Sequence, residues 1–571
     1  MINTQGQIKD SLKVLYPGCF ERVYQAVVEL IEKWRPECFP KYRWIDNSDV
    51  LMIAYGDAVR RKGEAPLSTL KKLMDAEFRD DINIIHLLPM FPYSSDDGFS
   101  VIDFRKINPD LGTWKDIEKL NSTYDLMFDA VINHVSRESP WFKGFAEGNP
   151  AYRHFFITAD PNWDYTKVVR PRSLPLLTRV ETLEGPQDLW TTFSEDQIDL
   201  NYKNPAVLLE ILDILLLYAS RGARFIRFDA IGFAWKEPGT SCMHLRQVHE
   251  MVKLMRSVLQ SCAPLCSIIT ETNVPHAENI SYFGNGCDEA ALVYQFPLPP
   301  LVLFSFLMQD ASRLTEWAAS LEPTGKDTAY FNFLASHDGI GLRPVEGLLS
   351  DAERDFMVRE TLARGGQIGY RSLSDGSEVP YELNINYLDA IAGDGTEHSA
   401  GAAGRAPPPD TQRQAQKFMA SQCILLSMMG MPAIYYHSLF GSRGDPAAYK
   451  ESGIKRRINR EKLDADLLMG ELRQKGTLRN LVADRFRHLI GLRKTLPAFH
   501  PNSPQRVLTL KPEVFALLRG EGAEQVLALV NVSGRTVTVQ SGWAGTDLVG
   551  GEVCGAAVEL APWQYRWIRV Q

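Results

Sequence analysis

The sequence is poor in cysteine, with 8 such residues among 571, and no two of them form a CxxC pair. A disulfide framework therefore does not organise this chain, and the cysteine spacing typical of zinc sites is absent. Scattered cysteines of this kind are usually reduced and buried, which favours a cytoplasmic protein.

Long hydrophobic runs are also missing. No segment approaches the ~18 consecutive apolar residues of a membrane span, and residues 1–12 lack the apolar core of a signal peptide. An excess of positive charge is absent too, because 70 Asp and Glu outnumber 62 Lys and Arg and give a net charge of −8. We therefore expect a soluble cytoplasmic protein that binds neither nucleic acid nor a membrane.

What the chain does contain is a series of short apolar segments that alternate with helical patterns. Near-continuous apolar runs are typical of parallel strands that helices cover on both faces. Eight strands are predicted in this way, at 50–55, 82–88, 126–132, 224–233, 266–271, 291–296, 331–336 and 431–436. This alternation predicts an α/β fold of the (β/α)8 TIM-barrel type, which takes roughly 250 residues and leaves room for further domains.

Other regions interrupt or extend the predicted barrel. Residues 1–48 show a helical apolar stripe, and 138–201 break the strand–helix rhythm with many Trp, Pro, Asp and Arg residues. A glycine-, alanine- and proline-rich stretch at 401–409 is typical of a mobile surface loop. We predict an N-terminal helical segment (1–48), a catalytic barrel (49–137 and 202–504), a domain inserted after strand 3 over the barrel mouth (138–201), an insert with the acceptor loop after strand 7 (341–412) and a C-terminal β-sandwich (505–571).

Acidic side chains follow several of the predicted strands. Arg227 and Asp229 lie two residues apart in an extended run and therefore on one face, where the guanidinium keeps the carboxylate ionised and oriented. An isolated Arg-x-Asp pair is more often a structural ion pair. Here Glu271 and Asp338 follow two other strands, and the carboxyl ends of barrel strands meet at one mouth where active sites lie. A fixed, ionised carboxylate beside a second acid is what a retaining glycosidase needs.

Four motifs occur in order along the chain: Asp129-Ala-Val-Ile-Asn133-His134, Arg227-Phe-Asp229, an apolar run into Glu271, and His337-Asp338. This pattern resembles the α-amylase superfamily, glycoside hydrolase family 13, over essentially the whole chain. The resemblance implies that Asp229 is the nucleophile and Glu271 the general acid and then base. It also implies that Asp338 binds sugar hydroxyls and distorts the ring.

Within this superfamily the chain resembles the sucrose phosphorylase branch, through segments 95–99, 170–175, 190–193 and 337–341. That resemblance implies a β-glucosyl ester on Asp229, which phosphate then attacks. It also implies a set of residues that bind the glucose unit or orient the nucleophile: Asp96, Phe99, His134, Arg227, Phe233, His337 and Arg460. Arg170 and Arg172 could supply an anion site for phosphate or for an acceptor carboxylate, although two arginines around a proline are more often solvated surface.

Three positions near the predicted acceptor site depart from sucrose phosphorylases. Asn273 replaces a His, Phe233 replaces a Tyr, and Tyr381-Glu382 replaces Tyr-Gln. A carboxylate at Glu382 would repel an anionic acceptor, unless it pairs with Arg170 or Arg172. With segments 235–242, 271–276 and 381–384, the chain more closely resembles the glucosylglycerate phosphorylases.

That resemblance implies a retaining phosphorylase that converts 2-O-α-glucosyl-D-glycerate and phosphate to α-D-glucose 1-phosphate and D-glycerate. Sucrose phosphorylase, sucrose 6′-phosphate phosphorylase and an α-glucosidase-type hydrolase remain alternatives. An inactive barrel that serves as an interaction subunit is less consistent with the complete set of acids.

The expected partners are small molecules, namely the α-glucoside and phosphate, and the expected assembly is a monomer or a homodimer. No cofactor is predicted, because inorganic phosphate is a co-substrate. No metal is predicted either, since residues 138–201 contain no convincing acidic cluster for calcium.

Overall fold

The structure is a computed structural model that describes residues 4–38, 43–264, 266–372, 377–393 and 410–571. Its centre is a closed barrel in which every neighbouring pair of strands is parallel. In chain order its strands are β1 (Leu51–Ala54), β3 (Ile84–Leu87), β4 (Asp125–Ala130), β9 (Ala223–Phe228), β10 (Ser267–Thr270), β11 (Leu292–Tyr294), β12 (Ala329–Asn332) and β16 (Met431–Tyr435). The eight-stranded barrel predicted from the sequence is confirmed.

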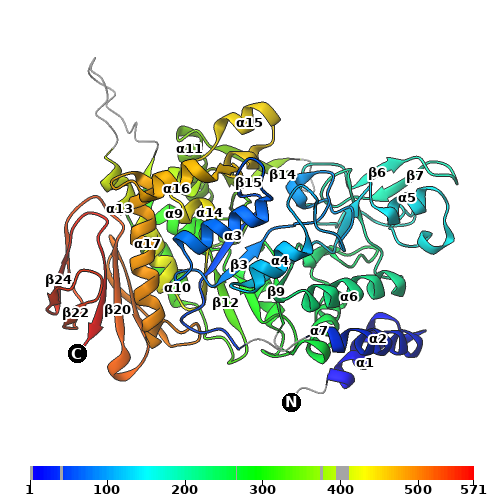
Figure 1. Cartoon of the computed structure of the whole chain (residues 1–571), viewed down its shortest axis with the longest axis horizontal. Helices are drawn as coiled ribbons and strands as arrows, with labels where there is room; N and C mark the ends of the chain where they lie inside the picture. Colours follow the sequence, from blue (N-terminus) through cyan, green and yellow to red (C-terminus); the bar gives the residue numbers. More distant parts are fainter. Residues whose placement is uncertain (1–3, 39–42, 265, 373–376, 394–409) are drawn as a thin grey trace.

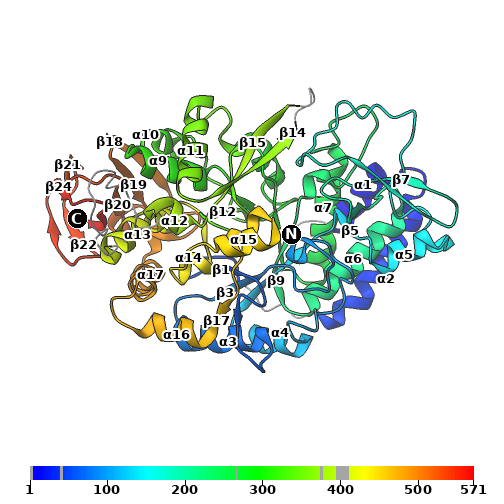
Figure 2. The same ribbon diagram turned by 90° about the horizontal axis from the view of Figure 1, so that it is seen from above.

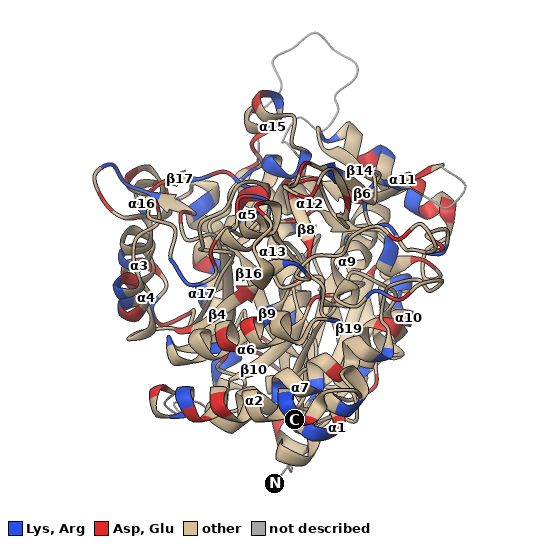
Figure 3. Ribbon diagram, turned by 90° about the vertical axis from the view of Figure 1, so that its right-hand side faces the viewer, with Lys and Arg blue, Asp and Glu red and all other residues tan. Residues whose placement is uncertain are grey.

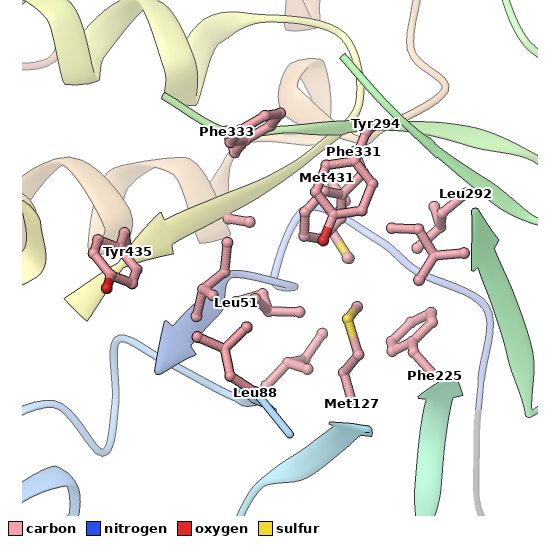
Figure 4. Close-up of a cluster of buried hydrophobic side chains, with 14 of the residues drawn as sticks. Leu51, Leu88, Met127, Phe225, Leu292, Tyr294, Phe331, Phe333, Met431 and Tyr435 are labelled. Atoms are coloured by element: carbon pink, nitrogen blue, oxygen red, sulfur yellow. The ribbon is translucent and has the colours of Figure 1, made fainter. Parts of the chain in front are cut away.

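The barrel interior is a packed apolar core. Side chains from different strands converge there, including Leu51, Met127, Phe225 and Met431, as Figure 4 shows. All four are 0–1% exposed, which explains why the barrel strands read as continuous apolar runs instead of alternating patterns.

Helices follow most of the barrel strands and cover their outer faces (Figure 1). One of them, α6, has a Pro in its first turn. The side chain of Asn204, just before this helix, caps it by accepting a hydrogen bond from Ala206 N at 3.1 Å. These helices are α3 (Pro66–Glu77), α4 (Trp114–Asn121), α6 (Pro205–Ser220), α7 (Arg246–Cys262), α9 (Leu298–Met308), α10 (Ser312–Ala319), α13 (Thr411–Ser427) and α17 (Leu478–Thr495).

Two N-terminal helices, α1 (Thr4–Leu15) and α2 (Phe20–Trp34), pack against α7 and α6 at the periphery of the barrel. Val23, Val27 and Ile31 form the buried stripe of α2, at the spacing of one helix face. No described helix is long and apolar enough to cross a membrane.

The segment after β4 carries two small antiparallel sheets, one of β5 and β8 and one of β6 and β7. In Figure 1 it projects to the right of the barrel. Its elements are β5 (His134–Ser136), α5 (Pro140–Ala146), β6 (Leu177–Val180), β7 (Gln187–Trp190) and β8 (Gln197–Asp199).

The segment after β12 forms a three-stranded antiparallel sheet of β13 (Ile340–Gly341), β15 (Glu378–Asn384) and β14 (Gln367–Ser372), with α11 (Asp351–Ala363) between β13 and β14 in the chain. Figure 2 shows β14 and β15 as a hairpin extending from the barrel. Tyr381 and Glu382, predicted in an acceptor loop, therefore lie in a strand, because β15 pairs with both neighbours. The predicted loop at 401–409 lies outside the described residues.

The C-terminal region is a β-sandwich beside α13 and α17 (Figure 1). A buried apolar cluster that includes Ala516, Leu529, Val539 and Ile568 lies between its two sheets. One sheet contains β18 (Gln505–Lys511), β19 (Val514–Arg519), β20 (Val526–Asn531), β25 (Tyr565–Val570), β22 (Gly545–Asp547) and β23 (Val553–Cys554), and the other contains β21 (Val537–Gln540) and β24 (Ala557–Leu560). Charges of both signs alternate over the exterior shown in Figure 3.

Most strand boundaries differ by a few residues from the sequence prediction, and two of these differences concern the ends of strands next to predicted site residues. Strand β12 spans Ala329–Asn332, whereas the prediction was 331–336, so His337 and Asp338 lie in a loop beyond the strand. Strand β9 ends at Phe228, and the apolar residues that follow form a 3-10 turn at Ile231–Phe233. Apolar character alone does not distinguish a strand from a buried turn that continues it.

Candidate active site

A pocket opens at the carboxyl ends of the barrel strands and brings together side chains that are far apart in the sequence. Asp229 directly follows β9, and Glu271 directly follows β10. The pocket is lined by Asp96, Phe99, His134, Pro171, Arg172, Phe193, Gln197, Asp229, Ala230, Gly232, Phe233, Met243, Glu271, Thr272, Asn273, His337, Asp338, Arg343, Tyr381 and Arg456. The three predicted catalytic acids thus share one pocket.

Arg227 lies beneath the pocket and connects the acids. Its Nη1 donates to Asp229 Oδ1 at 2.8 Å and also to Asp129, while its Nη2 lies 3.9 Å from Glu271 Oε2. Asp129 is the register partner of Arg227 on the neighbouring strand, and its other oxygen lies 2.8 Å from His86 Nε2. Burial opposes ionisation of Asp129, but Arg227 and His86 together hold its pKa below the ordinary value.

The chain reverses sharply after β9, at Ala230. Ala230 has a φ of 46°, in the left-handed region that L-residues with a side chain adopt at a cost of ~1 kcal/mol. In this conformation Ala230 N donates to Glu271 Oε2 at 3.0 Å. The turn that follows Asp229 therefore positions the carboxyl group of Glu271.

Asp229 and Glu271 are buried together, and this raises the pKa of both. Burial is the main cause for Asp229, and with the nearby Glu271 it raises the pKa to about 8 against the opposing effect of Arg227. Burial and Asp338 raise the pKa of Glu271. The pair consequently retains one proton near neutral pH. The two carboxyl groups share this proton, and the hydrogen bond from Arg227 to Asp229, with none to Glu271, favours Glu271 as its carrier.

Asp338 has the opposite environment. Arg456 Nη1 lies 2.5 Å from Asp338 Oδ1, and Arg460 Nη2 lies 3.7 Å from the same oxygen. Although burial alone would raise it, Arg456, His337 and Arg460 hold the pKa of Asp338 well below the ordinary value. Asp338 is therefore a permanent anion at neutral pH.

Arg456 also accounts for Glu382. Its Nη2 and Nε donate to Glu382 Oε1 and Oε2 at 2.8 and 3.1 Å, a two-pronged contact that neutralises a carboxylate only 3% exposed. The proposed pairing of Glu382 with Arg170 or Arg172 is therefore wrong.

The end of the pocket that is predicted to receive glucose is rigidly held. His337 stacks on Phe99 with ring centroids 4.6 Å apart, and His134 Nε2 lies 2.8 Å from Phe99 O. Arg460 does not line the pocket but supports it, since its Nη1 contacts Asp97 at 2.9 Å and its Nε donates to His337 O at 2.9 Å. Asp96 does line the pocket.

The other end of the pocket contains the predicted acceptor residues Arg172, Asn273 and Tyr381, with Phe233 on its wall. Arg172 forms no ion pair with any residue that the structure describes. Burial raises the pKa of Tyr381 to about 12, with Arg172 acting in the opposite sense, so Tyr381 is a neutral hydroxyl near this guanidinium.

Arg170 behaves differently from Arg172. It is not among the pocket-lining residues, and its Nη2 donates to the backbone oxygen of Leu174. Residues 171–174 form a series of bends and not a strand, so the two arginines do not share one face. Of the predicted pair, the structure places only Arg172 at the pocket.

Several residues of the site had not been predicted. Arg456 belongs to the basic run 455–460, and this concentration of charge could have indicated a site residue. The sequence around Arg343 and Met243 offers no comparable signal. Lys236 lies 2.5 Å from the buried carboxylate of Asp199, which also accepts from Asn133 beside His134. The residues concerned are His86, Phe193, Gln197, Lys236, Met243, Arg343 and Arg456.

Comparison with known proteins identifies the family. A model of the α-amylase catalytic domain matches residues 81–341. A protein of Allomeiothermus silvanus named glucosylglycerate phosphorylase is 47% identical over 534 residues, which cover 93% of both chains. The chain belongs to the α-amylase family, glycoside hydrolase family 13.

A second family 13 relative, the glucosylglycerate phosphorylase of Escherichia coli, is 41% identical over 570 residues, covering 99% of this chain and 100% of the relative. The crystal structure of sucrose 6F-phosphate phosphorylase from Thermoanaerobacter thermosaccharolyticum has a TM-score of 0.74 and 23% identity, covering 90% and 98% of the two chains. The latter likeness concerns the fold alone. Within family 13 this chain is an enzyme of the glycoside phosphorylase type.

The described part of the chain contains no cluster of three or more His, Cys, Asp or Glu residues arranged to hold a metal ion. The absence of a cofactor stays a prediction.

Proposed function

We propose that this enzyme converts 2-O-α-glucosyl-D-glycerate and phosphate to α-D-glucose 1-phosphate and D-glycerate, with retention at the anomeric carbon. The observation that carries the proposal is that two buried acids, Asp229 and Glu271, share a pocket with a cation, Arg172, that no described carboxylate neutralises. Relatives that are 41% and 47% identical and bear the name glucosylglycerate phosphorylase support the choice of glucoside.

In the first half-reaction the carboxylate of Asp229 attacks the anomeric carbon, and the bond from that carbon to the glycerate oxygen breaks. Glu271 donates its proton to the departing oxygen, which leaves glycerate neutral at that hydroxyl and a β-glucosyl ester on Asp229. The hydrogen bond from Arg227 keeps Asp229 ionised, and the raised pKa of Glu271 keeps the proton available.

In the second half-reaction phosphate takes the place of glycerate. Glu271, now a carboxylate, accepts a proton from the attacking phosphate oxygen as that oxygen bonds to the anomeric carbon and the ester to Asp229 breaks. A phosphate anion entering a pocket of acids is repelled unless a cation offsets the charge. Arg172 supplies that cation, and phosphate thereby competes with water for the ester.

The remaining pocket residues bind the glucose unit in this proposal. Asp338, held as an anion by Arg456, accepts hydrogen bonds from sugar hydroxyls. His134 and His337 provide further polar contacts, with Phe99 as an apolar wall on which His337 is stacked. Because Arg456, His337 and Arg460 keep Asp338 ionised, no proton has to move before the sugar binds.

The test is release of glucose 1-phosphate, with and without phosphate, from glucosylglycerate and sucrose in parallel. The proposal requires phosphate-dependent product from glucosylglycerate. Product from sucrose alone would change the acceptor, and free glucose independent of phosphate would indicate a hydrolase. Arg172→Met should weaken the use of phosphate, whereas Arg179→Met, in an arginine that is 64% exposed on β6, serves as the matched control.

A further inference from the structure

Arg343 is a second arginine of the acceptor end of the pocket. It is the first residue of a 3-10 turn, Arg343–Val345, directly after β13. The preceding residue donates from Leu342 N to Tyr381 O at 2.9 Å, which extends the pairing of β13 with β15. This pairing places Arg343 beside Tyr381, on the pocket wall that also contains Asn273.

The charge of Arg343 is poorly compensated by the surrounding side chains. Its side chain is 14% exposed, and its nearest carboxylate contact is 4.0 Å, from Nη2 to Glu278 Oε2. By contrast, Arg456 has carboxylate oxygens at 2.5 and 2.8 Å. The Arg343 guanidinium also contacts Met243 Sδ, with Nη1 at 4.0 Å. A largely buried cation with so distant a partner favours the entry of an anion.

The counter-ion of Arg343 can readily be exchanged. Glu278 is 47% exposed, so water solvates its carboxylate if the arginine turns away. Glu278 also lies 3.6 Å from His244 Nε2, but burial and the charge of Arg343 lower the pKa of His244 to about 4, so this histidine is neutral near pH 7.

Asn273 adds an unpaired acceptor to the same wall. Its Oδ1 is buried and has no hydrogen-bond partner among the residues that the structure describes. Glycerate combines a carboxylate with hydroxyl groups, and therefore matches a guanidinium beside an amide oxygen that lacks a donor.

We infer that Arg343 is the specificity-determining residue that binds the carboxylate of the acceptor, exchanging its distant contact with Glu278 for a direct one. Asn273 Oδ1 accepts a hydrogen bond from an acceptor hydroxyl in the same complex. The inference rests on the proposed function, and it assigns the carboxylate to Arg343 where the sequence had suggested only Arg170 and Arg172.

The experiment measures the reverse reaction, in which glucose 1-phosphate and an acceptor release phosphate. D-glycerate is compared with its methyl ester, which has nearly the same shape but no charge. Arg343→Met should reduce the preference for glycerate over the ester by about 10- to 100-fold, as expected for the loss of a charged hydrogen bond. Arg343→Lys should restore part of it, because the charge returns without the two-pronged geometry.

Glu278→Gln provides a test of opposite sign. Removing the competing carboxylate should lower the KM for glycerate by up to about fivefold, the range of a solvent-exposed ion pair, and leave the KM for the ester unchanged. It also keeps the inference testable should Arg343→Met fold poorly. Arg179→Met is again the matched control.

The outcomes separate the two levels of the argument. If the wild-type enzyme releases no phosphate with glycerate, the proposed substrate is wrong and the inference falls with it. If the wild-type enzyme uses glycerate but Arg343→Met slows glycerate and its ester equally, Arg343 has a structural role and the inference alone is overturned. An unchanged glycerate KM in Glu278→Gln would also contradict the exchange of partners.

Discussion

Replacing Asp229, the proposed nucleophile, should make the folded protein more stable at neutral and alkaline pH. Asp229 and Glu271 are buried together, and the pKa of Asp229 rises from 3.8 to about 8. A carboxyl group whose pKa is raised on folding contributes stability that is fully present below the unfolded pKa and is lost as the pH rises through the folded value. The wild-type enzyme therefore loses stability between about pH 4 and pH 8 through this pair. Asp229→Asn removes one of the two acids and with it this loss.

The magnitude follows from the same rise in pKa. At about 1.36 kcal/mol per pKa unit, keeping this proton at pH 7 lowers the free energy of unfolding by ~4 kcal/mol relative to its value near pH 4. Against this gain, Arg227 loses its 2.8 Å contact with an ionised carboxylate, which costs ~1.5–3 kcal/mol. Arg227 keeps Asp129 as a partner. We expect a net stabilisation of about 1–3 kcal/mol at pH 7.

The assay compares the Tm of Asp229→Asn and wild type across the range from about pH 5 to pH 8.5. The difference should favour the variant at the alkaline end and shrink toward the acidic end, while phosphorolysis falls by at least about 10³-fold throughout. A variant that is less stable than wild type by the same margin at every pH would refute the buried-charge reasoning. The wild-type rate should itself decline above about pH 8, as the pair loses the proton that Glu271 donates.

Three further substitutions test other parts of the structure. Arg172→Met should raise the KM for phosphate by about 10- to 100-fold, and Arg170→Met should raise it much less because Arg170 lies outside the pocket; equal effects in initial-rate measurements would contradict that placement. Glu382→Gln should lower kcat by weakening the hold on Arg456, and an unchanged kcat would show that Arg456 holds its position without this partner. Arg224→Met, which breaks a buried pair with Asp49 at 3.0 Å, should destabilise the fold by ~3–5 kcal/mol in thermal unfolding, with little change in substrate KM. A large KM change with unaltered stability would mean that Arg224 acts on the site.

The barrel could be predicted because its physics is local in the sequence. Parallel strands that are buried on both faces read as apolar runs, and all eight were located in this way. The predicted strand ends were less accurate where apolar residues continue beyond the last hydrogen bond between neighbouring strands. The turn at Ile231–Phe233, which follows β9, is an example. The strand assignment of Tyr381 and Glu382 was missed, since β15 is stabilised by its pairing with β13 and β14 and not by an apolar pattern.

The three acids of the pocket could be predicted from the sequence to lie together, but their electrostatic partners could not. Asp229, Glu271 and Asp338 each follow a strand within a recognisable motif. Arg456 and Glu382, however, are 74 residues apart, and their contact depends on how β15 passes the turn at 455–459. Arg343 stands in no motif, and only the pairing of β13 with β15 brings it to the pocket.

In the proposed reaction, the arrangement of charge suits one pocket to both a positively charged sugar and an anionic acceptor. Three arginines near the predicted glucose end each contact at least two carboxylates: Arg227 with Asp129 and Asp229, Arg456 with Asp338 and Glu382, and Arg460 with Asp96 and Asp97. This surplus of negative charge stabilises the positive charge that develops on the sugar in the transition state of glycoside cleavage. The same surplus would repel phosphate and glycerate. Arg172 and Arg343 at the acceptor end have no close carboxylate, and their charge offsets that repulsion where the anion enters.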